Sequence, residues 1–429
     1  ALIPVEFDGD ATPPPSAPTI AGEGADNVDY SPYLWTDADS NPGPGFAGDF
    51  SEIGVPVGGD INADGIDTVE DGGTVHLQAG EYQPSAKIVL DRNVTLAGAQ
   101  AGNDARDRTI GPDETIIDGG GMPASGANHA VVQMTKAGAT LDGVTVRNFA
   151  RPGVQMSIGS SGYTLRNSII TDTSIGLDLE TADAGAQPTT IERNRFEANN
   201  RPSAQSGIYG DGTATDVTIR DNLFTGHTNV PINIAGVGAG RVQRDLTISG
   251  NTFVDERHLL LLDAENVQVT NNTFTDGRSQ AISVQGGLHD LTIAGNTITN
   301  VDGAGVLFVD YYGAGPSDST TISANTITGA NAGGHADEAA ITVSQRPRPG
   351  QTGNPPGYAG TLAVSGNRIV DNDGGIRNDV AGASVDATGN WWGCNAGPGS
   401  AGCDSVTGDN IDASSPLQLS ASATPNVVG

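Results

Sequence analysis

The sequence predicts a parallel β-helix, a rod in which short strands stack from coil to coil. A phrase of the form Asn-x-Ile or Asn-x-Phe recurs along the chain, and a short strand with alternating apolar residues precedes each copy. A second short strand follows each copy after a turn. The apolar period is two residues, and glycine or asparagine interrupts every segment, so these observations exclude a helical repeat.

The repeated phrases mark the coils. They begin at Asn167, Asn194, Asn222, Asn251, Asn272, Asn296, Asn325, Asn367 and Asn390. The preceding strands have one apolar anchor each: Leu96, Ile117, Leu141, Leu165, Ile191, Ile219, Ile248, Val269, Ile293, Ile322 and Val364. A single coil cannot bury its own inner face, so about 11 to 13 coils are expected to stack around a shared core. The asparagines are predicted to be structural, because a side-chain amide at a turn can bond its own backbone and its copies in adjacent coils.

The ends of the chain lack the repeat, which divides the sequence into four parts. Residues 1–26 are predicted to be a Pro-rich arm, 27–72 an N-terminal segment and cap, 73–390 the β-helix, and 391–429 a C-terminal cap and tail. The arm starts with an apolar segment that we expect to add as a strand to a neighbouring copy, a mode that main-chain bonds and buried side chains would stabilise. Its apolar residues are Leu2, Ile3, Val5 and Phe7.

The segment DINADGIDTVED has two interpretations. Asp60, Asn62, Asp64 and Asp71 have the spacing of oxygen ligands in a calcium loop, although position twelve has Asp where such a loop has Glu. The alternative, which we favour, is a short helix that caps the first coil with Ile61, Ile66 and Val69. Calcium is therefore the one cofactor that the sequence suggests.

The C-terminal segment contains both cysteines of the chain. Cys394 and Cys403 are predicted to form a disulfide, which implies an oxidising compartment. Trp391 and Trp392 precede them, and we expect this pair to cover the last coil, with a sugar-stacking platform as the alternative. The chain begins ALIPV, as a mature secreted product would. An extracellular or cell-surface location is expected.

Charge limits the possible partners. With 51 acidic and 20 basic residues the formal net charge is -31, so nucleic acid and anionic membranes are poor partners. The sequence contains no apolar run long enough to cross a membrane, so membrane insertion is not expected.

Several segments resemble a known group. GGTVHLQAGEY (72–82), NVTLAGAQAGNDARDRT (93–109), the GNTF and GNTI coils and the ATGNWWGCNAGPGSAGCD ending are similar to extracellular right-handed parallel β-helix repeat proteins, the broad group with pectate-lyase-like folds. The resemblance covers roughly residues 60 to 419 and implies a right-handed solenoid. The group includes polysaccharide lyases, hydrolases and esterases, and also surface proteins whose β-helix is only a rod. The resemblance therefore implies a fold and does not select a function.

Two long loops contain the best candidates for glycan contact. The candidates are Asp310, Tyr311, Tyr312, Arg346, Arg348 and Tyr358. Arginine can pair with a uronate carboxylate and tyrosine can stack on a sugar, but no motif identifies a catalytic residue. Our first hypothesis is therefore a structural protein, a rigid subunit of a homopolymeric surface filament, sheath or adhesive fibre assembled through its arm. The alternative is a polysaccharide lyase or a glycan-binding protein acting on acidic polysaccharide.

Overall fold

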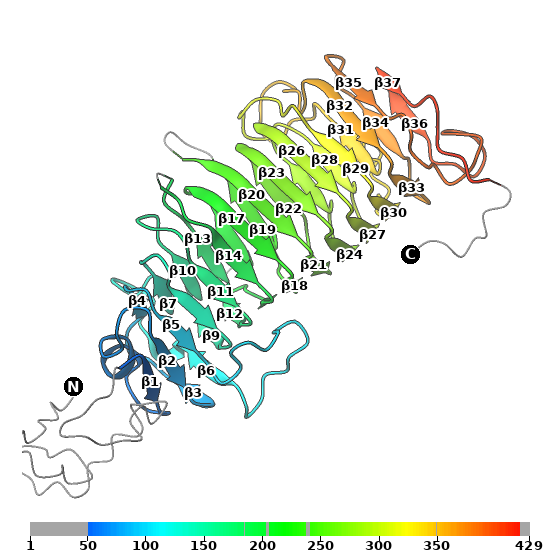
Figure 1. Ribbon diagram of the computed structural model, residues 1–429. Helices are drawn as coiled ribbons and strands as arrows, with labels where there is room; N and C mark the ends of the chain where they lie inside the picture. Colours follow the sequence, from blue (N-terminus) through cyan, green and yellow to red (C-terminus); the bar gives the residue numbers. More distant parts are fainter. Residues whose placement is uncertain (1–49, 184, 203–205, 237–240, 349, 421–429) are drawn as a thin grey trace, which may run out of the picture.

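The chain forms a rod of stacked coils, as predicted (Figure 1). The computed structural model describes residues 50–420, apart from residues 184, 203–205, 237–240 and 349. Three parallel sheets run along the rod, and strands β1 and β37 lie at opposite ends. The arm with Leu2, Ile3, Val5 and Phe7 lies outside the described residues.

The largest sheet has fourteen strands in chain order. They are β1 (Glu52–Val55), β2 (Thr74–Leu77), β5 (Thr95–Ala97), β8 (Thr140–Asp142), β11 (Thr164–Arg166), β14 (Thr189–Glu192), β17 (Ala214–Arg220), β20 (Gln243–Ser249), β23 (Ala264–Thr270), β26 (Leu288–Ala294), β29 (Thr321–Ser323), β32 (Gly360–Ser365), β35 (Ala383–Asp386) and β37 (Ile411–Asp412). The number of strands exceeds the 11 to 13 coils that the sequence predicted, because the first and last strands lie in segments without the asparagine phrase.

A twelve-stranded sheet forms the second side of the rod. It contains β4 (Ile88–Leu90), β7 (Val132–Met134), β10 (Val154–Met156), β13 (Leu177–Leu179), β16 (Ile208–Gly210), β19 (Ile232–Ala235), β22 (Leu259–Leu262), β25 (Ile282–Val284), β28 (Val306–Phe308), β31 (Ile341–Val343), β34 (Ile376–Asn378) and β36 (Val406–Gly408).

An eleven-stranded sheet forms the third side. It contains β3 (Gly80–Tyr82), β6 (Thr115–Asp118), β9 (Thr145–Phe149), β12 (Ile169–Thr173), β15 (Arg195–Glu197), β18 (Leu223–Thr225), β21 (Thr252–Val254), β24 (Thr273–Gly277), β27 (Thr297–Val301), β30 (Thr326–Ala330) and β33 (Arg368–Val370). A 3-10 turn, η2 (Gly119–Gly121), follows β6.

Inward side chains of the three sheets form one continuous core. The predicted anchors are buried and pair in register from coil to coil, as Ile219 does with Ile248. Four phenylalanine rings in the eleven-stranded sheet stack with centroids 5.1, 4.9 and 4.5 Å apart; these are Phe196, Phe224, Phe253 and Phe274. One anchor was assigned to the wrong sheet. Ile117 lies in β6 of the eleven-stranded sheet, whereas the other anchors lie in the fourteen-stranded sheet, because the long connection after β5 displaces the repeat there.

The repeated asparagines form a ladder at the turn between the fourteen-stranded and eleven-stranded sheets. Asn251 is representative: its Nδ2 donates to Ile219 O at 2.9 Å and to Asn272 Oδ1 at 3.0 Å. Its Oδ1 accepts from both nitrogens of Asn222. The same pattern runs from Asn194 to Asn390. The predicted structural role is confirmed for these eight residues, because each side-chain amide both donates and accepts hydrogen bonds within the protein.

The first repeat phrase was misaligned by one residue. Ser168, and not Asn167, occupies the ladder position, since Ser168 N donates to Asn194 Oδ1 at 3.0 Å. Asn167 instead takes the preceding left-handed position with φ of 51°, where its amide donates to Asp142. Asparagine tolerates that backbone conformation better than most residues. Asn167 therefore has a different structural role from the asparagines of the ladder.

Both ends of the rod are capped. A single π-helical turn, η1 (Ile61–Ile66), lies over the first coil, and Ile61, Ile66 and Val69 are buried, which confirms the capping interpretation. At the other end Trp392 is fully buried in the core and Cys394 is bonded to Cys403, as predicted. The burial of Trp392 excludes it from stacking on a sugar. Among the described residues no helix is long and apolar enough to cross a membrane.

The strands extend beyond the predicted boundaries of the β-helix. Strand β1 begins at Glu52, within the segment assigned to the cap, and β36 and β37 follow the assigned end at residue 390. These strands were missed because their sequences lack the asparagine phrase. Each nonetheless pairs in parallel with a strand of the neighbouring coil, β1 with β2, β36 with β34 and β37 with β35, so cap and solenoid are continuous at both ends.

Candidate functional site

The predicted glycan-contact residues lie together, but most of them hold loops in place. Arg346 Nε donates to Tyr311 Oη at 2.9 Å, and its two terminal nitrogens bond Asp337 and Glu338. Burial opposes the charge of Arg346, but Glu338 and Tyr311 together outweigh burial and raise the pKa of Arg346. Arg346 is therefore already paired inside the protein.

The other predicted contacts differ in exposure. The Asp310 carboxylate is buried and accepts from the backbone N–H groups of Gly313, Ala314 and Gly315, so it shapes its own loop. Tyr358 is buried in the core, where its hydroxyl accepts from Thr320 N. Only Tyr312 offers an open ring: it is 48% exposed, and the Arg348 guanidinium lies 4.8 Å from its centroid.

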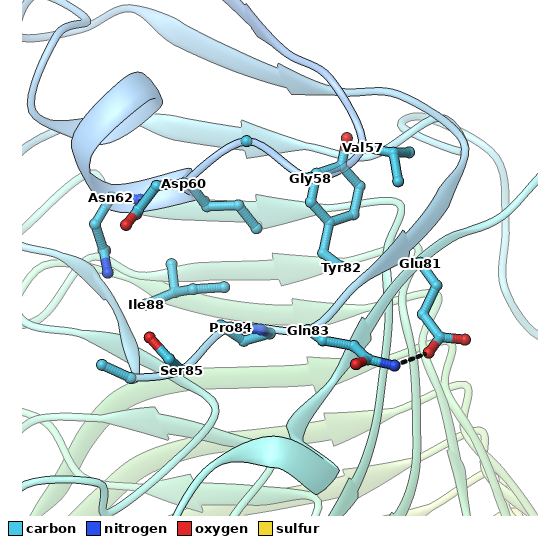
Figure 2. Close-up of a pocket in the computed structure, with 13 residues that line it drawn as sticks. Val57, Gly58, Asp60, Asn62, Glu81, Tyr82, Gln83, Pro84, Ser85 and Ile88 are labelled. Carbon is cyan, nitrogen blue, oxygen red and sulfur yellow. Dashed lines mark hydrogen bonds between the residues drawn. The ribbon is translucent and has the colours of Figure 1, made fainter. Parts of the chain in front are cut away.

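The predicted calcium residues cap backbone groups. Asp60 Oδ1 accepts from Asn62 N and Ala63 N, and Asp64 Oδ2 accepts from Asp60 N at 2.8 Å. Asp71 Oδ1 accepts from Asn93 N. Figure 2 shows Asp60 and Asn62 beside a pocket between η1 and the connection from β3 to β4. The described residues include no group of three acidic, histidine or cysteine side chains arranged to hold a metal ion.

Asp60→Ala is expected to lower the free energy of unfolding by about 1 kcal/mol, because two N–H groups at the start of η1 lose their acceptor. Urea unfolding followed by circular dichroism measures this loss, with Asp67→Ala as an exposed control on the same turn. An equal loss in calcium and in EDTA is expected of a cap. A loss that appears only in calcium would instead identify Asp60 as a calcium ligand.

The outer face of the twelve-stranded sheet has two unlike halves. From β22 to β31 its outward residues are covered; Leu260, Ser283, Leu307 and Thr342 are each at most 8% exposed. Tyr311, on the connection after β28, packs on the outward cluster of Ala304, Leu307 and Val309, and Arg346, on the connection after β31, bonds Tyr311. From β7 to β19 the outward residues are only half-buried.

The half-buried stretch forms what we call the polar floor. Because parallel strands are in register, its side chains stand in one column along the rod axis. The column contains Gln133, Gln155, Asp178, Tyr209 and Asn233. Glu180 and Asp211 directly follow the ends of β13 and β16.

Three carboxyl groups gather on the polar floor. Asp178 and Glu180 leave β13 on the same side because side chains alternate along a strand, and Asp211 follows β16 in the next coil. Tyr209 Oη donates to Asp211 Oδ2 at 3.2 Å, and the Arg241 guanidinium lies 3.4 Å from the same carboxylate. Gly212 leaves room for Glu180, since a Cβ there would lie 2.3 Å from its Oε1.

The environment makes two of these carboxyl groups weaker acids. Burial raises the pKa of Asp178, and the Asp211 charge adds to this while a bond from Gln155 opposes it. Burial, followed by the charges of Asp178 and Asp211, raises the pKa of Glu180. Burial and the neighbouring Asp211 raise the pKa of Tyr209 to about 12, so its hydroxyl stays protonated. A carboxyl group with a raised pKa beside a second carboxyl group is an arrangement that acid–base catalysis can use.

Sequence reasoning missed the polar floor, although a signal was present. Leu-Asp-Leu-Glu at 177–180 and Ile-Tyr-Gly-Asp at 208–211 alternate apolar and polar residues in consecutive coils. Aligning the coils by this second strand, and not by the asparagine phrase, would have placed the three carboxyl groups side by side. Chain order alone separates Asp178 from Asp211.

Comparison with known proteins supports the fold. The family model described as "Right handed beta helix region" matches residues 124–253 and 235–392, more than half of the chain. No curated protein matches the chain. Structural neighbours include the catalytic unit of a thermostable GH87 alpha-1,3-glucanase from Streptomyces thermodiastaticus strain HF3-3, with a TM-score of 0.46 and 14% identity over 84% of this chain and 67% of that one.

Two further structural neighbours have similar TM-scores and sequence identities. DFA-IIIase from Arthrobacter chlorophenolicus A6 has a TM-score of 0.46 and 14% identity over 88% of this chain and 97% of that one. Alginate lyase from Paenibacillus sp. str. FPU-7 has a TM-score of 0.44 and 12% identity over 81% of this chain and 95% of that one. At these identities no residue role carries over from the neighbours.

Proposed function

The chain belongs to the right-handed beta helix family, and we propose that it uses this fold to hydrolyse a glycosidic bond of a neutral polysaccharide on the polar floor. One observation carries the proposal: Asp178, Glu180 and Asp211 share one open face, and the surroundings raise the pKa of the first two. Glycoside hydrolysis commonly uses a pair of carboxyl groups that flank the bond, one protonated and one ionised.

The geometry suggests a role for each group. Asp178 gives its proton to the bridging oxygen as that bond breaks, a water molecule adds to the anomeric carbon, and Asp211 takes the proton that the water loses. Tyr209 and Arg241 both contact Oδ2 of the Asp211 carboxylate and hold it in place. The charges of Asp178 and Asp211 both act on Glu180, so it lies close to the two catalytic carboxyl groups. In its ionised form Glu180 would favour a developing positive charge on the sugar ring.

The charge of the floor favours a neutral substrate over the acidic polysaccharide of the alternative hypothesis. Uronate recognition relies on arginine or lysine that is available to a carboxylate. Among the described residues around the floor, Lys87 is bonded to Gln133 and Arg241 is paired with Asp211. Arg346, in the neighbouring covered half, is paired with Glu338. Three carboxyl groups and a net charge of -31 would also repel an anionic chain.

Release of reducing ends from a panel of neutral and acidic polysaccharides tests the proposal. We expect the wild-type protein to act on a neutral glycan, and Asp211→Asn and Glu180→Gln to lose at least about 100-fold in kcat/KM. Asp172→Asn is the matched control, since this exposed aspartate lies on another side of the coil that contains Asp178. Activity on none of the glycans, or full activity in Asp211→Asn, would contradict the proposal.

The filament hypothesis stays a prediction. Assembly was expected to depend on the arm, and Leu2, Ile3, Val5 and Phe7 lie outside the described residues. A hydrolase and a filament subunit are also compatible on one rod, because the polar floor occupies a side of the rod and strand addition would use its ends.

A further inference from the structure

A line of hydrogen bonds runs along the polar floor and ends on Asp178. Lys87 Nζ donates to Gln133 Oε1 at 2.5 Å, and Gln133 Nε2 donates to Gln155 Oε1 at 2.9 Å. Gln155 Nε2 then donates to Asp178 Oδ2 at 2.9 Å. The four residues come from four consecutive coils, and we call this line the amide relay.

The chemistry of its first member fixes the direction of the amide relay. A lysine ammonium can only donate, so Gln133 must turn its oxygen toward Lys87 and its nitrogen toward the next coil. Gln155 must then turn its oxygen toward Gln133 and its nitrogen toward Asp178. Without a residue at one end that can only donate, each glutamine amide could adopt either of its two orientations. Its NH2 group and its oxygen have nearly equal size, so shape alone does not choose between them.

Lys87 is itself held at its backbone. Its carbonyl oxygen accepts from Asn62 Nδ2 at 3.0 Å, and its N–H donates to Asn128 Oδ1 at 3.2 Å. The N-terminal cap, through Asn62, therefore fixes the residue at which the amide relay begins.

We infer that Lys87 is a positioning residue that, through Gln133 and Gln155, determines which oxygen of Asp178 carries the catalytic proton; the inference rests on the proposed function. Oδ2 accepts the Gln155 N–H and has no room for a proton in that direction. The described residues supply no hydrogen bond to Oδ1, so the proton of a neutral Asp178 belongs there, on the oxygen left for a ligand. Reversal of the relay would turn a glutamine oxygen toward Asp178, draw the proton to Oδ2 and remove it from the substrate.

A direct effect of the Lys87 charge on Asp178 is small. Three coil steps separate the two residues, which is about 14 Å. At physiological ionic strength charges at that separation are largely screened. The charged and titratable groups that act on Asp178 or respond to its charge at short range are Glu180, Asp211 and Tyr209. The relay is thus the route by which Lys87 affects Asp178.

Titration of Asp178 tests the inference without requiring activity. The protein is labelled with carbon-13 at the aspartate carboxyl, and the Asp178 signal is identified by its loss in Asp178→Asn. Lys87→Met and Gln133→Leu are each expected to raise the pKa of Asp178 by roughly one pH unit, because the bond that favours the ionised form is lost. The double variant should shift it no further, and Lys87→Arg, which also only donates, should restore the wild-type value.

The controls separate the relay from simpler effects. Lys136→Met removes the same charge at the one other lysine, an exposed residue, and should leave the pKa of Asp178 unchanged. A shift in Lys87→Met without one in Gln133→Leu would overturn the inference in favour of direct electrostatics, and no shift in either would overturn it outright. In an active protein, Lys87→Met should also lower kcat more than it raises KM. If the pKa moves but no glycan is cleaved, the proposed function fails and the relay stands.

Discussion

Asp178→Asn is expected to lower kcat on the cleaved polysaccharide by about 10²- to 10⁴-fold, the contribution of a positioned general acid. The same substitution is expected to raise the melting temperature at neutral pH. Asparagine keeps the size of aspartate and removes a charge that burial disfavours. Loss of activity together with a gain in stability is a combination that a disrupted fold cannot produce.

The stability gain should depend on pH in a defined direction. Because the pKa of Asp178 is higher in the folded protein than in the unfolded chain, the folded state binds this proton more tightly. Its contribution to stability is fully present below the unfolded pKa and is lost as pH rises through the folded pKa. The difference in melting temperature between Asp178→Asn and the wild type should therefore grow from acid toward neutral pH.

Calorimetry across that pH range, with Asp172→Asn as the exposed control, measures the difference. A melting temperature for Asp178→Asn that falls at neutral pH would show that the carboxylate stabilises the fold, and its assignment as the proton donor would then be wrong. Equal pH dependence in both variants would show that the buried environment of Asp178 has no special effect.

Asn251→Ala is expected to lower the free energy of unfolding by about 3 to 5 kcal/mol. The substitution leaves the N–H of Asn222, one amide hydrogen of Asn222 and the carbonyl of Ile219 without their partners. Each buried polar group left unpaired costs roughly 1–3 kcal/mol. Asn251 lies inside the ladder, so groups in both adjacent coils are affected.

Denaturant unfolding followed by circular dichroism measures this loss. Asn103→Ala is a suitable control, since that residue is exposed and its amide donates to the nearby Gln100. Asn251→Asp should cost at least as much as Asn251→Ala, because it keeps the shape but turns a carboxylate oxygen toward two acceptors. A loss below about 1 kcal/mol in Asn251→Ala would mean that water replaces the missing amide.

Much of the fold could be predicted because the same physical requirement recurs in every coil. A turn that buries polar backbone selects asparagine, and a shared narrow core selects an apolar anchor before it. The alignment failed at Asn167 and Ile117, where an adjacent residue or a long connection alters the local spacing. The end strands β1, β36 and β37 were missed because edge coils do not need the ladder to continue on both sides.

The site could not be predicted to the same extent because it depends on what covers the rod. Tyr311 and Arg346 were predicted to contact a glycan, yet they bond each other and Tyr311 packs on outward residues of the sheet. The outward residues of the two halves differ, but the asparagine phrase by which the coils were aligned is the same in both. The carboxyl groups Asp178 and Asp211 become neighbours only through the register of β13 with β16.

The stacking of the coils also determines how the rod bears a mechanical load. Hydrogen bonds between coils lie along the rod axis, so a force that separates β1 from β37 stretches them along their length and opens the structure one coil at a time from an end. Such peeling needs less force than shearing many bonds at once. At the C-terminal end, the Cys394–Cys403 bond closes a covalent loop beside the buried Trp392. A pull on that end is therefore expected to be resisted first by the cap, and reduction of the disulfide should weaken the rod at its tip without altering the central coils.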